Sequence, residues 1–86
     1  MVTTNKMMDK EYTLLEYKKD EKIPYLKGTR IRIDIIYCYD YKVERKTPEY
    51  IAKNRDLPLQ DIRQAIEWCT LNDDLVTKVL TQENNN

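Results

Sequence analysis

The chain has 86 residues, of which 41% are hydrophobic and 35% are charged, and its 15 basic residues balance 15 acidic ones. This length provides one small domain with a modest core and excludes two, while the zero net charge argues against a strongly nonspecific nucleic-acid binder. No stretch reaches the roughly 18 apolar residues of a membrane span, and the first residues lack the apolar run of a signal peptide, so we expect a cytoplasmic protein without a membrane partner.

The N-terminal third predicts a short β-hairpin or arm. Residues 1–11 are polar and lack a clear period, so we expect them to form a loosely ordered lead. Residues 12–17 and 23–26 then contain β-favouring side chains on either side of the charged, turn-like stretch 18–22. Gly28 is the only glycine in the sequence, and it marks the place where a positive φ is most easily accommodated.

A first helix is predicted from about Ile33 to Tyr41, with Asp34 in its first turn. Two apolar stripes run along this segment: Ile33, Ile36 and Tyr37, and Ile35, Cys38 and Tyr39. Two stripes predict a helix that is buried over a wide arc. Such a helix would be the central support of a three-helix unit.

Two helix-start signals, in residues 47–52 and 57–62, have the spacing of a helix-turn-helix. Thr47 can accept a backbone N–H as an N-cap, and the fixed φ of Pro48 suits the first helical position. This helix can run for only about two turns, because Pro58 lacks an N–H and pushes the residue before it away from helical geometry. The chain therefore turns through the four residues before Pro58, and a second helix begins just after it.

The second helix has two regular sides. The buried side is predicted from apolar residues at i, i+3, i+4 and i+7: Ile62, Ala65, Ile66 and Cys69. The opposite side has the same spacing in polar residues: Gln60, Arg63, Gln64 and Glu67. Glutamine and arginine have the shapes that read adenine and guanine edges in a major groove. A solvated surface is the alternative for such a stripe, but the preceding helix and turn favour contacts with bases.

Charge is unevenly distributed along the chain. Residues 27–46 contain six basic and three acidic residues, whereas residues 72–86 contain one basic and three acidic ones. We expect the phosphate contacts of a DNA-bound chain to come from four residues: Arg45, Lys46, Lys53 and Arg55. The alternative is a surface charge that serves only solubility.

A fourth, short helix is predicted after Asn72, an N-cap followed by two acidic first-turn residues. It carries an apolar face that can pack on the bundle or on a second subunit. With the tyrosines of the first half, which equally fit partly buried packing, this face gives the predicted partner or dimer surface: Tyr12, Tyr17, Leu75, Val76, Val79 and Leu80. No linker interrupts the chain, so we expect one domain at 12–82 and a frayed tail at 83–86.

The residue types needed for catalysis or metal binding are scarce. The chain has no histidine, and its two cysteines, Cys38 and Cys69, lie among apolar residues without a CxxC spacing. They predict two buried thiols, not a disulfide or a metal site. We find no carboxylate in an apolar block that could serve acid–base chemistry. The sequence therefore predicts a protein that is not an enzyme and has no cofactor.

Three blocks of the sequence, residues 22–31, 47–52 and 59–66, resemble in order the successive blocks of the domain-of-unknown-function family 433, over roughly residues 22–70. The first block, Lys-Ile-Pro-Tyr-Leu-Lys-Gly-Thr-Arg-Ile, is the most specific of the three. The resemblance implies a homeodomain-like three-helix fold. It also implies the role of an antitoxin, a small DNA-binding protein that pairs with a PIN-like ribonuclease toxin.

The chain departs from that family's pattern at two places. The connection at 42–46 is basic, lacks the usual glycine and is about two residues longer. Pro58 replaces a capping Ser or Thr, so Leu57 becomes an N-cap without a side-chain oxygen, which Asp61 partly offsets through the helix dipole.

The expected fold is therefore mainly α: a homeodomain-like three-helix bundle with a helix-turn-helix, a short N-terminal β-hairpin or arm, and a short C-terminal helix. Two functional hypotheses remain open. The first is a homodimeric DNA-binding antitoxin or autorepressor, a transcription regulator that reads double-stranded DNA with its second helix-turn-helix helix. The second is a protein-interaction module that binds a partner, for example a PIN-like ribonuclease toxin, without binding DNA.

Overall fold

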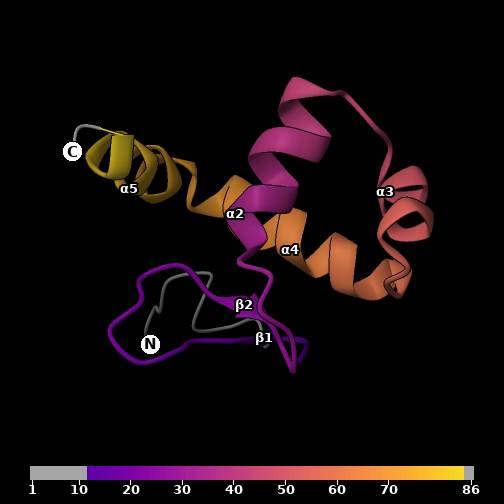
Figure 1. Ribbon diagram of the computed structural model, residues 1–86, viewed down its shortest axis with the longest axis horizontal. Coiled ribbons are helices and arrows are strands. Elements are labelled where there is room, and N and C mark those ends of the chain that lie inside the picture. Colours follow the sequence, from indigo (N-terminus) through magenta and orange to yellow (C-terminus); the bar gives the residue numbers. More distant parts are fainter. Residues whose placement is uncertain (1–11, 85–86) are drawn as a thin grey trace, which may run out of the picture.

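The computed structural model describes residues 12–84, so the expectations for residues 1–11 and 85–86 lie outside it. It is mainly helical with a two-stranded sheet, and its elements are β1 (Leu15–Glu16), β2 (Tyr25–Leu26), α2 (Ile33–Ile35) continuing into the π-helix η1 (Ile36–Val43), α3 (Pro48–Arg55), α4 (Leu59–Leu71) and α5 (Asp73–Asn84). Figure 1 shows α4 in the middle, with the hairpin below it and α2–η1 above it. No helix of the described part is long and apolar enough to cross a membrane.

The predicted hairpin is confirmed. β1 and β2 pair antiparallel with Leu15 opposite Leu26, and Tyr25 forms a further bridge with Arg32 just before α2. Gly28 lies in the turn between these segments with a φ of 77°, in agreement with its predicted role. The Gly28 N–H donates to a carboxylate oxygen of Glu16 at 3.3 Å. This bond is the main reason why the pKa of Glu16 is lowered.

The α2–η1 helix begins at Ile33, as predicted, but it ends at Val43, beyond the expected end, and its last eight residues are wound as a π-helix. Its Ile33, Ile36 and Tyr37 stripe is buried. The expectation of burial over a wide arc is wrong, because Ile35 and Tyr39 of the second stripe are 38% and 55% exposed. The reason is that α3 and α4 both pack on the inner side of this helix.

The π-helix explains how the long connection without glycine is accommodated. The Glu44 N–H donates to the Tyr39 carbonyl at 2.9 Å, a bond that spans five residues and takes up more chain per turn than an α-helix does. Arg45 then adopts a left-handed conformation with a φ of 59°. An arginine therefore occupies the backbone conformation that a glycine adopts at least cost.

The core lies between α2–η1, α3 and α4 and includes Leu26 of the hairpin and Val76 of α5. It also contains a carboxylate whose burial was not predicted: Asp34 is 1% exposed. The Arg32 guanidinium donates to both Asp34 oxygens, at 2.7 and 2.9 Å. The expectation that no carboxylate lies in an apolar block is thus wrong, and the bidentate pairing explains how this charge is buried.

α5 is joined to the rest of the bundle at its first turn. The Tyr37 hydroxyl donates to Asp73 Oδ1 at 2.9 Å, and Lys42 lies 3.4 Å from the same oxygen. The α5 helix is present as predicted and extends to Asn84, past the expected end of the domain at residue 82. Its Val76 is fully buried, and three neighbours pack against the core: Leu75, Val79 and Leu80. Much of the predicted partner surface is therefore used inside this chain.

Candidate nucleic-acid interface

The start of α3 confirms the predicted capping. Thr47 Oγ1 accepts a hydrogen bond from the Tyr50 N–H at 3.1 Å, and Pro48 occupies the first helical position. α3 ends at Arg55, where Asp56 takes a left-handed conformation with a φ of 58° and its N–H donates to the Lys53 carbonyl. This residue redirects the chain into the turn between the two helices.

The start of α4 differs from the expectation by one residue. The N-cap is Pro58, not Leu57, and no side chain caps the helix. The Pro58 carbonyl accepts the Asp61 N–H at 3.1 Å, so the helix is initiated by backbone bonds alone. Asp61 lies in the first turn, as expected, but partial burial raises the pKa of its carboxyl. Desolvation thus offsets part of the favourable interaction with the helix dipole.

The inner side of α4 is buried as predicted, at Ile62, Ala65, Ile66 and Cys69. The outer side is unevenly exposed. Gln60 and Arg63 are exposed, whereas Gln64, near the middle of the helix, and Glu67 are half-buried.

The hairpin is what covers α4 around Gln64 and Trp68. The Leu14 N–H donates to Gln64 Oε1 at 3.0 Å, and the Tyr17 ring packs edge-on against Trp68 with 6.4 Å between ring centroids. The hairpin is thereby fixed along one flank of α4 (Figure 1). Of the four residues predicted to face bases, Gln60 and Arg63 are therefore exposed to solvent. The side-chain oxygen of Gln64 instead binds the hairpin.

Arg63 has a partner that the sequence did not reveal. Its guanidinium lies 3.1 Å from a carboxylate oxygen of Glu49, in the first turn of α3. Both side chains are largely exposed, at 53% for Arg63 and 62% for Glu49. The pair joins α3 and α4 at the surface of the domain, and solvent screening makes it weak.

The four predicted phosphate-binding residues fall into two groups. Arg55 donates to both oxygens of Asp40, at 2.5 and 3.2 Å, and this carboxylate raises the pKa of Arg55. It therefore ties α3 to η1. The other three are accessible: Arg45 and Lys53 are exposed, and the Lys46 ammonium lies 4.8 Å from the centre of the Tyr50 ring.

The outer surface of α3 carries a shallow cavity of about 390 Å³ lined by Tyr50, Lys53 and Asn54. It combines an exposed aromatic ring, an ammonium group and an amide, all of which can contact a sugar–phosphate backbone. The exposed Tyr50 ring was not predicted as part of the site. Its signal in the sequence was its position two residues after the predicted start of the helix at Pro48.

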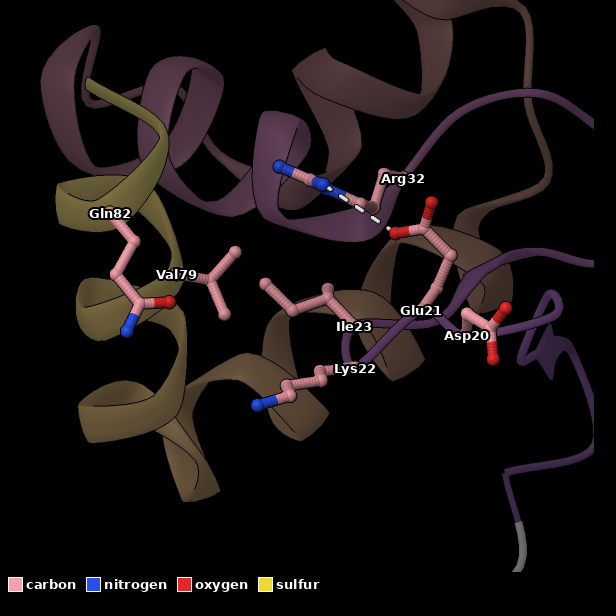
Figure 2. A pocket seen from close by; sticks show the side chains of 7 residues that line it. All are labelled: Asp20, Glu21, Lys22, Ile23, Arg32, Val79 and Gln82. Atoms are coloured by element: carbon pink, nitrogen blue, oxygen red, sulfur yellow. Dashed lines mark ion pairs between the residues drawn. The ribbon is translucent and has the colours of Figure 1, made fainter. Parts of the chain in front are cut away.

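A second cavity, of about 250 Å³, lies between the hairpin loop and α5 (Figure 2). Residues 20–23, Arg32, Val79 and Gln82 line it. Figure 2 shows Arg32 directed toward Glu21. The Arg32 guanidinium lies 3.7 Å from a Glu21 carboxylate oxygen. Because two carboxylates already neutralise this guanidinium, the lining residues present no buried, uncompensated charge to a ligand.

Nucleophilic and metal chemistry have little support within residues 12–84. Cys38 is half-buried and Cys69 buried, both as free thiols, and desolvation raises the pKa of each. A raised pKa leaves few reactive thiolates. In this range, the carboxylate and thiol side chains nowhere gather in a group of three that could hold a metal ion.

Comparisons with known proteins give no match: no family model matches the chain, and neither does any curated protein or solved structure. The resemblance to family 433 therefore depends on the three sequence blocks alone. The geometry of α3, the turn and α4 is the main basis for a functional interpretation.

Proposed function

We propose that the protein binds DNA in a sequence-specific manner through a homeodomain-like helix-turn-helix and acts as an antitoxin-like autorepressor. One observation carries the proposal: Gln60 and Arg63 project from the N-terminal half of α4, directly after a tight turn from α3. In helix-turn-helix proteins, the N-terminal residues of the second helix contact base edges, while the first helix crosses the backbone. The antitoxin role is what the resemblance adds.

In this arrangement Gln60 pairs with adenine and Arg63 with guanine, because their side chains can form two hydrogen bonds with these bases. Gln64 keeps the hairpin beside the groove, and half-buried Glu67 lies at the edge of the reading surface. The contact surface on α4 is therefore limited to its first two turns.

Arg45, Lys46 and Lys53 supply the phosphate contacts in this proposal, whereas Arg55 supports η1. Few such contacts predict a modest dependence of affinity on salt, since each neutralised phosphate adds about one to the slope of log K against log salt concentration. This agrees with a chain of zero net charge. It also makes base contacts the larger part of any useful affinity.

The test is fluorescence anisotropy with a duplex from the protein's own upstream region and a shuffled duplex, at about 50 and 200 mM salt. Arg63→Ala is expected to cost about 1–3 kcal/mol on the native duplex and to relax specificity. Lys53→Ala is expected to weaken both duplexes alike and to lower the salt slope by about one. Lys78→Ala, which removes an exposed charge from α5, is the matched control. Equal binding of both duplexes by the wild type would contradict the proposal.

A second candidate is a protein-interaction module that binds a partner such as a PIN-like ribonuclease without binding DNA. The charges of residues 48–71 favour it, because four acidic residues there outnumber three basic ones. Phosphates are repelled by such a surface. In the same titration, this candidate predicts no binding to either duplex at about 50 mM salt. It also predicts that a co-expressed ribonuclease partner stays bound at high salt, because apolar contacts are poorly screened.

A further inference from the structure

The outer face of the α2–η1 helix carries an apolar stripe that the fold leaves uncovered. Ile35, Tyr39 and Val43 are 38%, 55% and 70% exposed, while Ile36 and Tyr37 on the inner face are buried. The three lie four residues apart, and residues at this spacing stay on one side of a helix. Isolated exposed hydrophobic residues are ordinary, but a continuous stripe on a small, highly charged domain marks an interaction surface.

This stripe is separate from the partner surface expected from the sequence, of which Tyr17 is 58% exposed. Val76 lies in the core, and the other apolar residues of α5 pack against it. α5 therefore has little apolar surface left for a second subunit. The exposed stripe on α2–η1 lies on a different helix and has no covering element in residues 12–84.

We propose that this stripe is the contact surface of a homodimer in which two α2–η1 helices pack antiparallel across Tyr39. The spacing of the stripe is symmetric about Tyr39. An antiparallel copy therefore places Ile35 against Val43 at both ends and Tyr39 against Tyr39 at the two-fold axis. This is the self-complementary arrangement that a two-fold interface requires.

Charges at the two ends of the helix fit the same arrangement. Glu44 follows η1 directly, and Arg30 lies three residues before the start of α2; both are exposed, and neither forms an ion pair within residues 12–84. In an antiparallel pair, the end of each helix faces the beginning of the other, which brings Glu44 of one copy toward Arg30 of the other, twice per dimer. A parallel pair would place like charges together.

The dimer does not depend on DNA binding, so it is tested on the protein alone. Sedimentation equilibrium of the full chain, from micromolar to millimolar concentration, is expected to show a monomer–dimer equilibrium. Tyr39→Glu places two like charges at the axis and should weaken dimerisation by roughly 100-fold. Leu71→Glu, which makes the same kind of change at an exposed position of α4, should leave it unchanged. Circular dichroism verifies that both variants are folded.

The orientation is tested by charge reversal. Glu44→Arg and Arg30→Glu should each weaken the dimer by roughly 3–10-fold, because two exposed ion pairs are lost per dimer. The double variant should restore the affinity of the dimer. No such recovery is expected if either residue has a merely structural role. A wild type that remains monomeric throughout would overturn the proposal, as would equal effects of Tyr39→Glu and Leu71→Glu. Failure of the double variant to recover would overturn the antiparallel arrangement.

Discussion

Replacing Glu49 with glutamine is expected to increase DNA affinity, although it removes an interaction seen in the structure. Glu49 holds the Arg63 guanidinium at 3.1 Å, and Arg63 must leave this carboxylate to reach a base edge. The carboxylate also lies in the first turn of α3, the helix proposed to cross the DNA backbone. Under the proposed function, Glu49 thus opposes DNA binding in two ways, by competing for Arg63 and by repelling phosphates.

The expected size follows from the exposure of the pair. An ion pair between two side chains that are more than half exposed is worth about 0–1 kcal/mol, so its release costs no more than that. Removing a carboxylate near phosphates adds a comparable gain in low salt. The released competition for Arg63 and the removed repulsion together favour DNA binding by about 1 kcal/mol or slightly more, which corresponds to roughly 5–10-fold tighter binding. Stability should change in the opposite direction by about 1 kcal/mol, because the charge also interacts favourably with the α3 dipole.

The assay is anisotropy with the native duplex at about 50 and 200 mM salt, together with urea unfolding of the free protein. Asp74→Asn is the matched control, because it removes the same charge from an exposed position of α5. A double variant, Glu49→Gln with Arg63→Ala, should lose most of the gain if competition for Arg63 is its main source. Unchanged or weaker binding by Glu49→Gln would refute the reasoning and would mean that Glu49 positions Arg63 for the groove.

Three further outcomes are expected. Gln64→Ala should lower the free energy of unfolding by about 1 kcal/mol, because it removes the acceptor of the partly buried Leu14 N–H. Hydrogen exchange should then be faster at the Leu14 amide. Gln64→Glu retains an acceptor oxygen and should leave this amide protected from exchange. Asp73→Asn should destabilise by about 1 kcal/mol near neutral pH. Hydrogen bonding from Tyr37 lowers the pKa of Asp73. The contribution of Asp73 to stability is therefore fully present above its usual pKa of 3.8 and is lost as the pH falls through the lowered pKa. Urea unfolding at several pH values will show this loss. Arg45→Gly should stabilise by about 1 kcal/mol and raise the thermal midpoint by roughly 4–8 °C, measured by circular dichroism.

The parts of the fold that the sequence predicted well are those determined by neighbouring residues. Thr47 and Pro48 fix the start of α3 through one hydrogen bond and one constrained dihedral angle. Pro58, three residues after the end of α3, limits the length of this helix by an equally local constraint on the backbone. The inner side of α4 follows from four apolar residues at helical spacing, a pattern that lies entirely within this one helix. Gly28 was identified because a positive φ is a property of a single residue.

The candidate site was less predictable, because its side chains meet partners from distant segments. Gln64 and Leu14 are 50 positions apart, and Arg63 and Glu49 are 14 apart, so no local pattern indicates either contact. The polar stripe of α4 was correctly placed opposite its buried side. Which of its residues reach solvent depends on where the hairpin packs, and that is a tertiary property. Asp34 is different, because a preceding Arg32 in an isoleucine-rich segment was a visible signal of a buried pair.

The strain at Arg45 connects the stability of this domain with its proposed function. A left-handed backbone costs an ordinary residue about 1–2 kcal/mol, which is a large fraction of the stability of a domain this small. The Arg45 side chain is exposed and has no hydrogen bond or ion pair within residues 12–84 that would offset this cost. Glycine would therefore serve the backbone better here, whereas arginine serves the phosphate contacts that we propose. Arg45→Gly should accordingly raise stability and weaken DNA binding in the same variant. A rise in stability with unchanged affinity would remove Arg45 from the interface.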